Sequence, residues 1–439
     1  MTQKNQNGNI VAIVTMIFLF AMISFVTNLA VPIGVIWDNK VVGSGMMGNL
    51  MNFAAYLLMG IPAGKLLSKI GYKKTALAAI AVGFLGIFIQ YLSGVITMDT
   101  VIFSLPINFI VYLLGAFVAG MCVCMLNSVV NPMLDFLGGG GNRGNRLLQI
   151  GGSFNSLAAT ITPMIVGILI GTVTKDTAIS DVNLVLYIAM GVFAATFIIL
   201  SMIPIEDPEN AKKSVGAKMA HSPWHFRHFV LGATAIFIYV GLEVGIPGTL
   251  FFFLSDVTAN GGGLDPATAT ATAGIVAGTY WLLMFFGRMI GGAIGDKVSS
   301  KTMLMAASTI GIILVLAAMF SPVTTTISMP AFDKEAFTVE IVKAPISALL
   351  LVLCGFCTSI MWGGIFNLAT QGLGKYINAA SGIFMTMVVG GGVLPLIQNW
   401  VAGMSSYMIS YVIPLAGLVY LLYYALIGSK NVNKNIPVD

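Results

Sequence analysis

The chain has 439 residues, of which 57% are hydrophobic and only 8% are charged. Soluble domains carry about 25% charged residues, so this composition excludes a soluble globular protein. The formal net charge is +5. Because this excess lies mainly in loops on one side of the predicted membrane topology, it indicates no nucleic-acid partner.

Apolar runs recur along the whole chain, and each is long enough to cross a bilayer, which takes about 20 residues of helix. We predict an all-α membrane protein with twelve transmembrane helices. They lie near 10–36, 45–64, 75–96, 102–134, 147–173, 183–204, 229–254, 270–294, 302–321, 345–370, 378–402 and 405–428. The first run is too long for the core of a signal peptide, so we expect it to stay as a membrane helix.

The basic residues set the predicted orientation, because cytoplasmic loops of membrane proteins are enriched in lysine and arginine. With the amino terminus inside, most of them face the cytoplasm, including those of the loops 65–74 and 288–301. Only four lysines fall outside: Lys40, Lys175, Lys334 and Lys343. We therefore predict a multi-pass protein of a bacterial plasma (inner) membrane with both termini cytoplasmic.

A polar segment, IEDPENAKKSVGAKMAHSPWHFRH, divides the apolar runs into two groups of six. It predicts an amino-terminal six-helix bundle at 1–204, a cytoplasmic linker at 205–228 and a carboxy-terminal six-helix bundle at 229–439. The linker holds the chain's three histidines. A metal site there is conceivable, but Trp224 and Arg227 favour a segment at the membrane surface, so we expect no metal site.

A ten-residue pattern occurs twice, at positions 64–73 (GKLLSKIGYK) and 292–301 (GAIGDKVSSK), always between two spans. The equivalent positions are Gly64 and Gly292, Ser68 and Asp296, and Lys73 and Lys301. Glycine allows close helix approach, and the lysines can cap helix ends. The same offset at the same place in each half indicates duplication.

Twelve spans, two halves, a polar linker and this duplicated loop resemble the major facilitator superfamily, whose loop reads G-x-x-x-D-R-x-G-R-R. Asp296 keeps the family's aspartate, whereas Ser68 replaces it in the first copy. The resemblance implies two pseudo-symmetric six-helix bundles that rock about a central site. It also implies that the six repeated loop residues form a conformational latch, weaker in the amino half.

Four further stretches resemble one branch, the fucose–galactose–glucose proton symporter family. They are TNLAVP at 27–32 (N-D-I-L-L-P), NSVVNP at 127–132 (E-T-A-A-N-P), YVGLE at 239–243 (Y-V-G-A-E/Q) and VGGGVLPL at 389–396 (V-G-G-A-I-L-P-L). The chain departs where that family keeps its proton and sugar groups, an aspartate and a glutamate. Asn28 and Asn127 stand there, and Gly152 replaces a usual glutamine. Asparagine cannot exchange a proton, although it can hydrogen-bond a sugar.

A sugar pocket needs fixed hydrogen-bonding groups and an aromatic surface against the apolar face of the ring. The spans supply such residues: Asn28, Asn52, Asn127, Asn131, Asn155, Asn367 and Gln398, with Tyr239, Tyr280, Trp281 and Trp362. Each alone could merely bridge helices or sit at the membrane surface. As a group they predict a polar, substrate-binding cavity.

Glu243 is the one acid that we place well inside a span, where an unpaired carboxylate costs several kcal/mol. Gly241, Gly245 and the pair Pro247-Gly248 surround it, and they disfavour a regular helix. A helix break would let the carboxyl reach water in a cavity, where it could take a proton from one side and release it to the other. The alternative is a protonated glutamate that only hydrogen-bonds a neighbouring helix.

Together these features predict a secondary active transporter that imports a sugar or sugar derivative by alternating access, coupled to protons through Glu243. An uncoupled facilitator or an exporter of the same fold is the alternative. A membrane-embedded enzyme is disfavoured because the predicted spans hold no histidine and no acid–base pair, and a non-transporting sensor stays open. We expect no enzymatic activity, no cofactor, a monomer, and a sugar, a proton and the lipid bilayer as partners. The sequence leaves open which sugar is carried, and whether protons, sodium or nothing drives it.

Overall fold

The fold was determined as a computed structural model that describes most of the chain. The described residues are 3–41, 44, 47–96, 101–102, 105–170, 177–203, 205, 221–256, 258–265, 269–333, 338–433 and 435–438. Most of the predicted linker, at 206–220, lies outside them.

The amino-terminal half consists of long apolar helices joined by short connections. They are α1 (Gln3–Lys40), α2 (Met47–Ile70), α3 (Tyr72–Val95), α4 (Ile107–Leu137), α5 (Gly141–Ile170) and α6 (Asn183–Met202). Two short paired strands, β1 (Val101–Ile102) and β2 (Leu105–Pro106), precede α4. Because these helices expose apolar side chains to the outside as well as burying them, lipid is the solvent that suits them.

The carboxy-terminal half repeats this plan, but three of its spans are built from consecutive shorter helices. Its single helices are α8 (Arg227–Ser255), α9 (Ala269–Ile294) and α10 (Ser300–Phe320). The composite spans are α11 (Ile346–Ser359) with α12 (Met361–Thr370), α13 (Ile377–Thr386) with α14 (Gly390–Met404), and α15 (Tyr407–Ser410) with α16 (Val412–Tyr423). An antiparallel hairpin of β3 (Thr326–Asp333) and β4 (Thr338–Pro345) connects α10 to α11.

The all-α membrane fold predicted from the sequence is confirmed. Within the described residues, 11 helical stretches are long and apolar enough to cross a membrane. The 30-residue helix α5 stands where the remaining span was predicted. The seventh span begins at Arg227, so His228, which the sequence placed in the linker, lies in the first turn of α8 and is fully buried.

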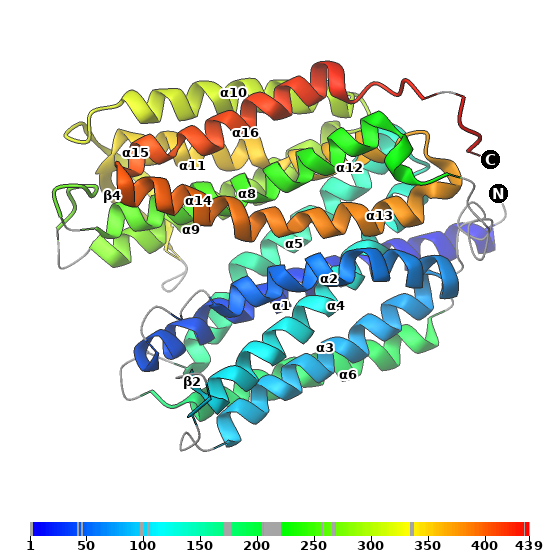
Figure 1. Cartoon of the computed structure of the whole chain (residues 1–439), viewed down its shortest axis with the longest axis horizontal. Coiled ribbons are helices and arrows are strands. Elements are labelled where there is room, and N and C mark those ends of the chain that lie inside the picture. Colours follow the sequence, from blue (N-terminus) through cyan, green and yellow to red (C-terminus); the bar gives the residue numbers. More distant parts are fainter. Residues whose placement is uncertain are drawn as a thin grey trace.

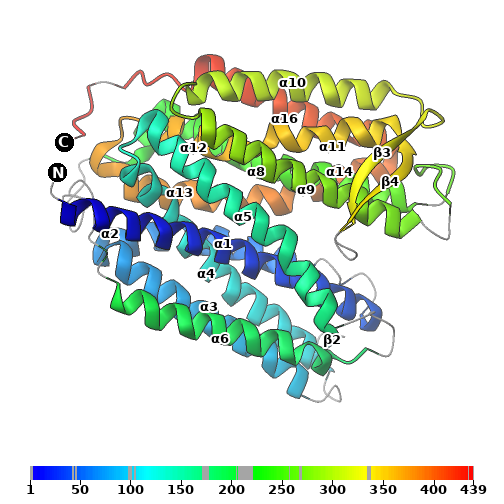
Figure 2. The same cartoon turned by 180° about the vertical axis from the view of Figure 1, so that it is seen from behind.

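The two halves form two bundles that lie side by side, with α1 to α6 in one and α8 to α16 in the other (Figure 1). Both ends of the chain lie at the same end of the bundles, which we call the termini side; the opposite end is the far side. The halves meet mainly where α2 packs on α13 and α5 packs on α9. Both views show the bundles diverging toward the far side (Figures 1 and 2).

Close backbone approach joins the halves at the termini side. A Cβ atom added to Gly64 of α2 would lie 2.9 Å from both the Asn378 carbonyl oxygen and the Gly382 Cα of α13. No side chain fits in that space, so glycine is needed for this contact. Nearby, the Tyr72 hydroxyl donates to Asn378 Oδ1 at 2.8 Å. The residues at the first copy of the duplicated loop thus hold α2 and α3 against α13 of the other half by close packing.

Candidate functional site

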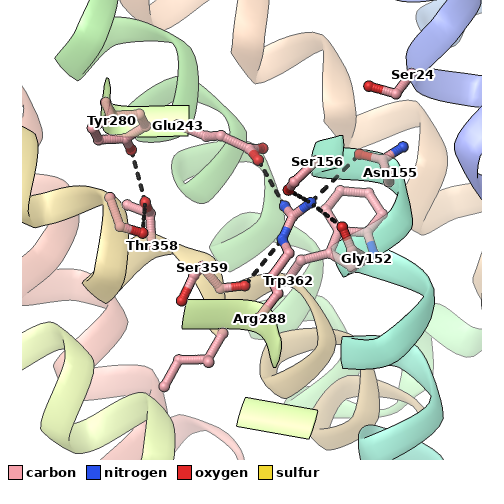
Figure 3. A network of polar contacts seen from close by, with 12 residues as sticks. Ser24, Gly152, Asn155, Ser156, Glu243, Tyr280, Arg288, Thr358, Ser359 and Trp362 are labelled. Carbon is pink, nitrogen blue, oxygen red and sulfur yellow. Dashed lines mark hydrogen bonds and ion pairs between the residues drawn. The ribbon is translucent and has the colours of Figure 1, made fainter. Parts of the chain in front are cut away.

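A buried ion pair lies near the middle of the carboxy-terminal half. Arg288 Nη2 of α9 lies 3.0 Å from Glu243 Oε1 of α8, and the two side chains are only 7% and 15% exposed (Figure 3). A buried carboxylate without a partner is costly in free energy. The positive guanidinium of Arg288 offsets this desolvation cost for Glu243. Glu243 therefore has a partner that the sequence did not indicate.

Arg288 also reaches across to the amino-terminal half. Its Nη1 donates to the Gly152 carbonyl oxygen at 2.9 Å and to Ser156 Oγ at 2.8 Å, both on α5, with Asn155 Oδ1 further off at 3.4 Å. A Cβ atom at Gly152 would lie 3.2 Å from Arg288 Cδ. The glycine that replaces the family's glutamine thus leaves room for the arginine, and one side chain ties α8, α9 and α5 together.

A second network crosses between the halves and contains no charge. Trp362 Nε1 of α12 donates to Asn131 Oδ1 of α4 at 2.8 Å. Asn131 Nδ2 donates to Asn127 Oδ1 at 3.2 Å, and Asn127 Nδ2 donates to the Tyr56 hydroxyl of α2 at 2.8 Å. Both asparagines are buried, and they lie one helical turn apart on one face of α4. Three predicted site residues thus meet in a single chain of hydrogen bonds.

Aromatic rings line the region between the two networks. The ring of Tyr239, one turn before Glu243 on α8, lies 6.2 Å from that of Trp362. Tyr280 on α9 is fully buried, and its hydroxyl hydrogen-bonds Thr358 Oγ1 at 2.7 Å (Figure 3). Trp281 meets the Tyr280 ring edge-on at 5.6 Å and is only partly buried. Three of the predicted aromatics therefore lie on α8 and α9, which carry the ion pair, and the fourth, Trp362, lies on α12.

The other predicted site residues lie around this centre or apart from it. Asn155 Nδ2 donates to the Phe20 carbonyl of α1, and Asn28 donates to Ser24 on the same helix. Gln398 is buried on α14, and its Nε2 makes no hydrogen bond with any described residue. Asn367 lies nearer the termini side, where it donates to Asp135 Oδ1 and the Gly141 carbonyl.

One sequence-based placement of charge is wrong. Arg288 was counted in a cytoplasmic loop, but it is a buried residue of α9, six residues before the helix ends. Glu243 was placed as the one acid well inside a span; α4 continues to Leu137, so Asp135, two residues before the end of that helix, is buried as well. Apolar neighbours on both sides of Arg288, such as Phe286 and Met289, were the signal for its position.

The predicted break around Glu243 is also wrong, because α8 is a continuous helix with Pro247 inside it. Proline has no N–H to donate to the carbonyl four residues earlier, which is that of Glu243. The glycines serve packing instead. A Cβ atom at Gly241 would clash with the Leu394 side chain, and one at Gly245 would lie 2.6 Å from Gln398 Oε1, so these glycines let α14 pack closely on α8.

The duplicated loops make equivalent contacts in the two halves. Lys73 Nζ donates to the carbonyls of Ser201 and Ile203 at the end of α6, and Lys301 Nζ donates to the Leu426 carbonyl after α16. The prediction that these lysines cap helix ends is confirmed. Asp296 pairs with Arg146 of α5 at 3.2 Å across the halves, whereas the Ser68 hydroxyl donates to the Gly64 carbonyl of its own helix and to no other described residue.

This arrangement is suited to binding and movement. Two side-chain networks join the halves at mid-depth, and further contacts hold them together on the termini side. One network contains the Glu243–Arg288 ion pair, and neutral amides and an indole form the other. Hydrogen-bonding groups next to aromatic faces can bind a polyhydroxylated ring.

Comparison with known proteins places the chain among transporters. The family model of the Major Facilitator Superfamily matches residues 13–396. A curated glucose/galactose transporter of Brucella abortus biovar 1 (strain 9-941) is 29% identical, over 98% of this chain and 96% of that protein. The L-fucose-proton symporter of Escherichia coli (strain K12) is 21% identical, over 85% of this chain and 81% of that protein.

A solved structure matches the fold over nearly the whole chain. A crystal structure of the E. coli fucose:proton symporter superposes with a TM-score of 0.76. It covers 97% of this chain and 100% of that chain, at 17% sequence identity. The likeness shows a shared arrangement of helices.

Proposed function

Because the chain belongs to the major facilitator superfamily, we propose that it is a secondary active transporter that imports a sugar or sugar derivative, coupled to protons through Glu243. The substrate class rests on relatives named as a glucose/galactose transporter and an L-fucose-proton symporter. The coupling rests on one observation, the buried Glu243–Arg288 pair whose arginine also binds α5.

The ion pair links protonation to the contact between the halves. While Glu243 is ionised, it holds Arg288 by a charge-assisted hydrogen bond, which is stronger than a neutral one. Taking up a proton removes the negative charge and leaves Arg288 with neutral acceptors only, on α5 and at the Ser359 carbonyl. The contact of Arg288 with the amino-terminal half therefore changes in strength with the protonation state of Glu243.

The neutral network supplies the contacts to the sugar. Asn127, Asn131 and Trp362 already bond one another, so a sugar hydroxyl that enters must replace one of these bonds. Because an exchange of hydrogen bonds is nearly balanced in free energy, a sugar can be bound without being held too tightly for release. Replacing the Trp362–Asn131 bond would also loosen one connection between the halves.

We further propose that the termini side is cytoplasmic, as the lysine and arginine distribution indicates. The divergence of the bundles at the far side (Figure 2) then corresponds to an outward-open conformation. Of the latch residues, Gly64, Gly292 and Asp296 contact the other half and would hold the cytoplasmic side closed in this conformation. Lys73 and Lys301 bond within their own halves and would hold the loops in place, with Ser68 contributing least.

The proposal is tested by reconstituting the purified protein into liposomes. Labelled glucose, galactose and fucose are offered with and without an inward proton gradient, and the internal concentration is followed. We expect at least one of them to accumulate above its external concentration only when the gradient is present. Equilibration without accumulation under both conditions would instead establish the facilitator.

A further inference from the structure

A polar pocket lies at the far-side end of the carboxy-terminal half, away from both networks. Its volume is about 320 Å³, within the range of roughly 300–1,000 Å³ of small-molecule sites. It is lined by the end of α8, the following loop, the end of α14 and the start of α15: Phe252, Asp256, Asn260, Asn399, Gly403 and Tyr407, among others.

The pocket faces the space between the halves. Asn399 follows Gly392 on α14 by seven residues, which is about two helical turns, so both lie on nearly the same face. A Cβ atom at Gly392 would contact Phe53 and Leu50 of α2 at 3.5 and 3.6 Å. That face of α14 is therefore turned toward the amino-terminal half. In the proposed orientation, the pocket stands at the outer entrance to the central residues.

The lining residues have the chemistry of a carbohydrate site. The side-chain amides of Asn260 and Asn399 make no hydrogen bond with any described residue, so their donors and acceptors are available. Phe252 is 41% exposed and, with Tyr407, offers an aromatic face for the apolar side of a sugar ring. An exposed aromatic next to unpaired amides and a carboxylate matches what a neutral polyol requires.

We infer that this pocket is a second sugar-binding site, at the entrance of the transport route, and that it selects neutral or amino sugars against acidic ones. The inference rests on the proposed function. The selectivity comes from Asp256, the only acid that lines the pocket among the described residues. The backbone N–H of Thr258 donates to Asp256 Oδ1 at 2.8 Å and lowers the pKa of that carboxyl, so Asp256 is ionised at neutral pH and repels a sugar carboxylate.

Protection of an introduced thiol tests the site directly. The four native cysteines are buried, so Asn399→Cys can be labelled with a membrane-impermeant maleimide over a low background. Glucose or galactose should slow this labelling several-fold, and glucuronate should not. Ser328→Cys, exposed on β3 outside the pocket, is the matched control and should be labelled at the same rate with and without sugar.

The same experiment in an Asn131→Ala background separates the pocket from the central site. If the pocket binds sugar itself, protection of Asn399→Cys persists there. If protection instead reflects closure of the halves around a centrally bound sugar, about 2 to 13 times more sugar is needed for the same protection, because one central hydrogen bond is lost, and the inference is overturned. Adding Asp256→Asn should allow glucuronate to protect as well; continued exclusion of glucuronate would overturn the charge-based selectivity.

Filling the pocket gives an independent measurement. A Cβ atom at Gly403 meets no atom within 4 Å, so Gly403→Trp can occupy the pocket without a backbone clash. We expect equilibrium binding of glucose or galactose to fall from two sites to one. Gly191→Trp on α6, equally open, should keep both. If the wild type and both variants each bind sugar at one site while transport is intact, the inference is overturned and the proposed function stands. If none of the proteins binds or transports any sugar, the proposed function is overturned.

Discussion

The two networks that join the halves differ in one property, electrical charge. The network of Arg288 contains a full ion pair and holds α5 through a guanidinium. The network of Asn131 reaches from Tyr56 to Trp362 through amides, a phenol and an indole. Both are buried, and both span the interface. Only the first contains a carboxyl group, to which we assign the proton; to the second we assign the exchange of hydrogen bonds with the sugar.

In the fucose–galactose–glucose proton symporter family, which this chain resembles, acids of the first and fourth spans serve both proton coupling and sugar binding. We propose that the two tasks lie on different networks here. Here the corresponding positions, Asn28 and Asn127, can only hydrogen-bond. The carboxyl group that remains at mid-depth, Glu243, lies in the other half, next to an arginine. Coupling and sugar binding are therefore expected to be separable by mutation.

Removing the arginine should have the largest effect. Arg288→Met leaves Glu243 buried without its partner, and breaking a buried ion pair costs about 3–5 kcal/mol. We expect a clear drop in the melting temperature of the detergent-purified protein and loss of transport. The double variant Glu243→Met with Arg288→Met should recover much of the stability, because an apolar pair is often as stable as a buried ion pair. Wild-type stability of Arg288→Met would show that the pair does not hold the helices.

Truncating the neutral network should weaken sugar binding without uncoupling it. Asn131→Ala or Asn127→Ala in this network, and likewise Asn28→Ala outside it, removes a hydrogen bond to the sugar worth about 0.5–1.5 kcal/mol, so the dissociation constant should rise by a factor of about 2 to 13. Asn108→Ala is the matched control. Asn108 is buried on α4, like Asn127 and Asn131, but its Oδ1 accepts a hydrogen bond from the backbone N–H of Phe109. Unchanged affinity in all three site variants would remove these amides from the sugar site.

Weakening the latch should have the smallest effect. Asp296 and Arg146 are 34% and 47% exposed, and exposed ion pairs contribute about 0.2–1 kcal/mol. Asp296→Asn should therefore shift the populations of the two conformations by no more than several-fold. Distances between spin labels at Ser328 and Val101, on the far side of the two halves, report this shift. A shift larger than this would mean that the latch, and not the central networks, controls the conformation.

Much of the fold follows from the sequence, because long apolar runs and the duplicated loop are local signals. The span boundaries agree with the helices to within seven residues, and the two lysines of the loops have the capping contacts expected. The glycine in each loop was expected to permit close approach, and Gly64 does so against Gly382. Such features need no knowledge of which helix lies next to which.

The site was predicted only in part, because its central contact joins residues that are 45 positions apart. A charged residue near the end of an apolar run reads as the start of a loop, which is why Arg288 was misplaced. Pro247 and its neighbouring glycines read as a break, yet the packing of α14 on α8 keeps that helix continuous. In contrast, Asn127 and Asn131 are four residues apart in the sequence, a spacing that is typical of one helix face.

We propose that Glu243 couples the proton to the sugar while the neutral network binds the sugar. Glu243→Gln keeps an oxygen acceptor for Arg288 but cannot exchange a proton. In proteoliposomes, we expect this variant to lose gradient-driven accumulation and to retain counterflow exchange of the sugar at a rate near that of the wild type. Accumulation of sugar against its gradient by Glu243→Gln would show that Glu243 is not the coupling residue.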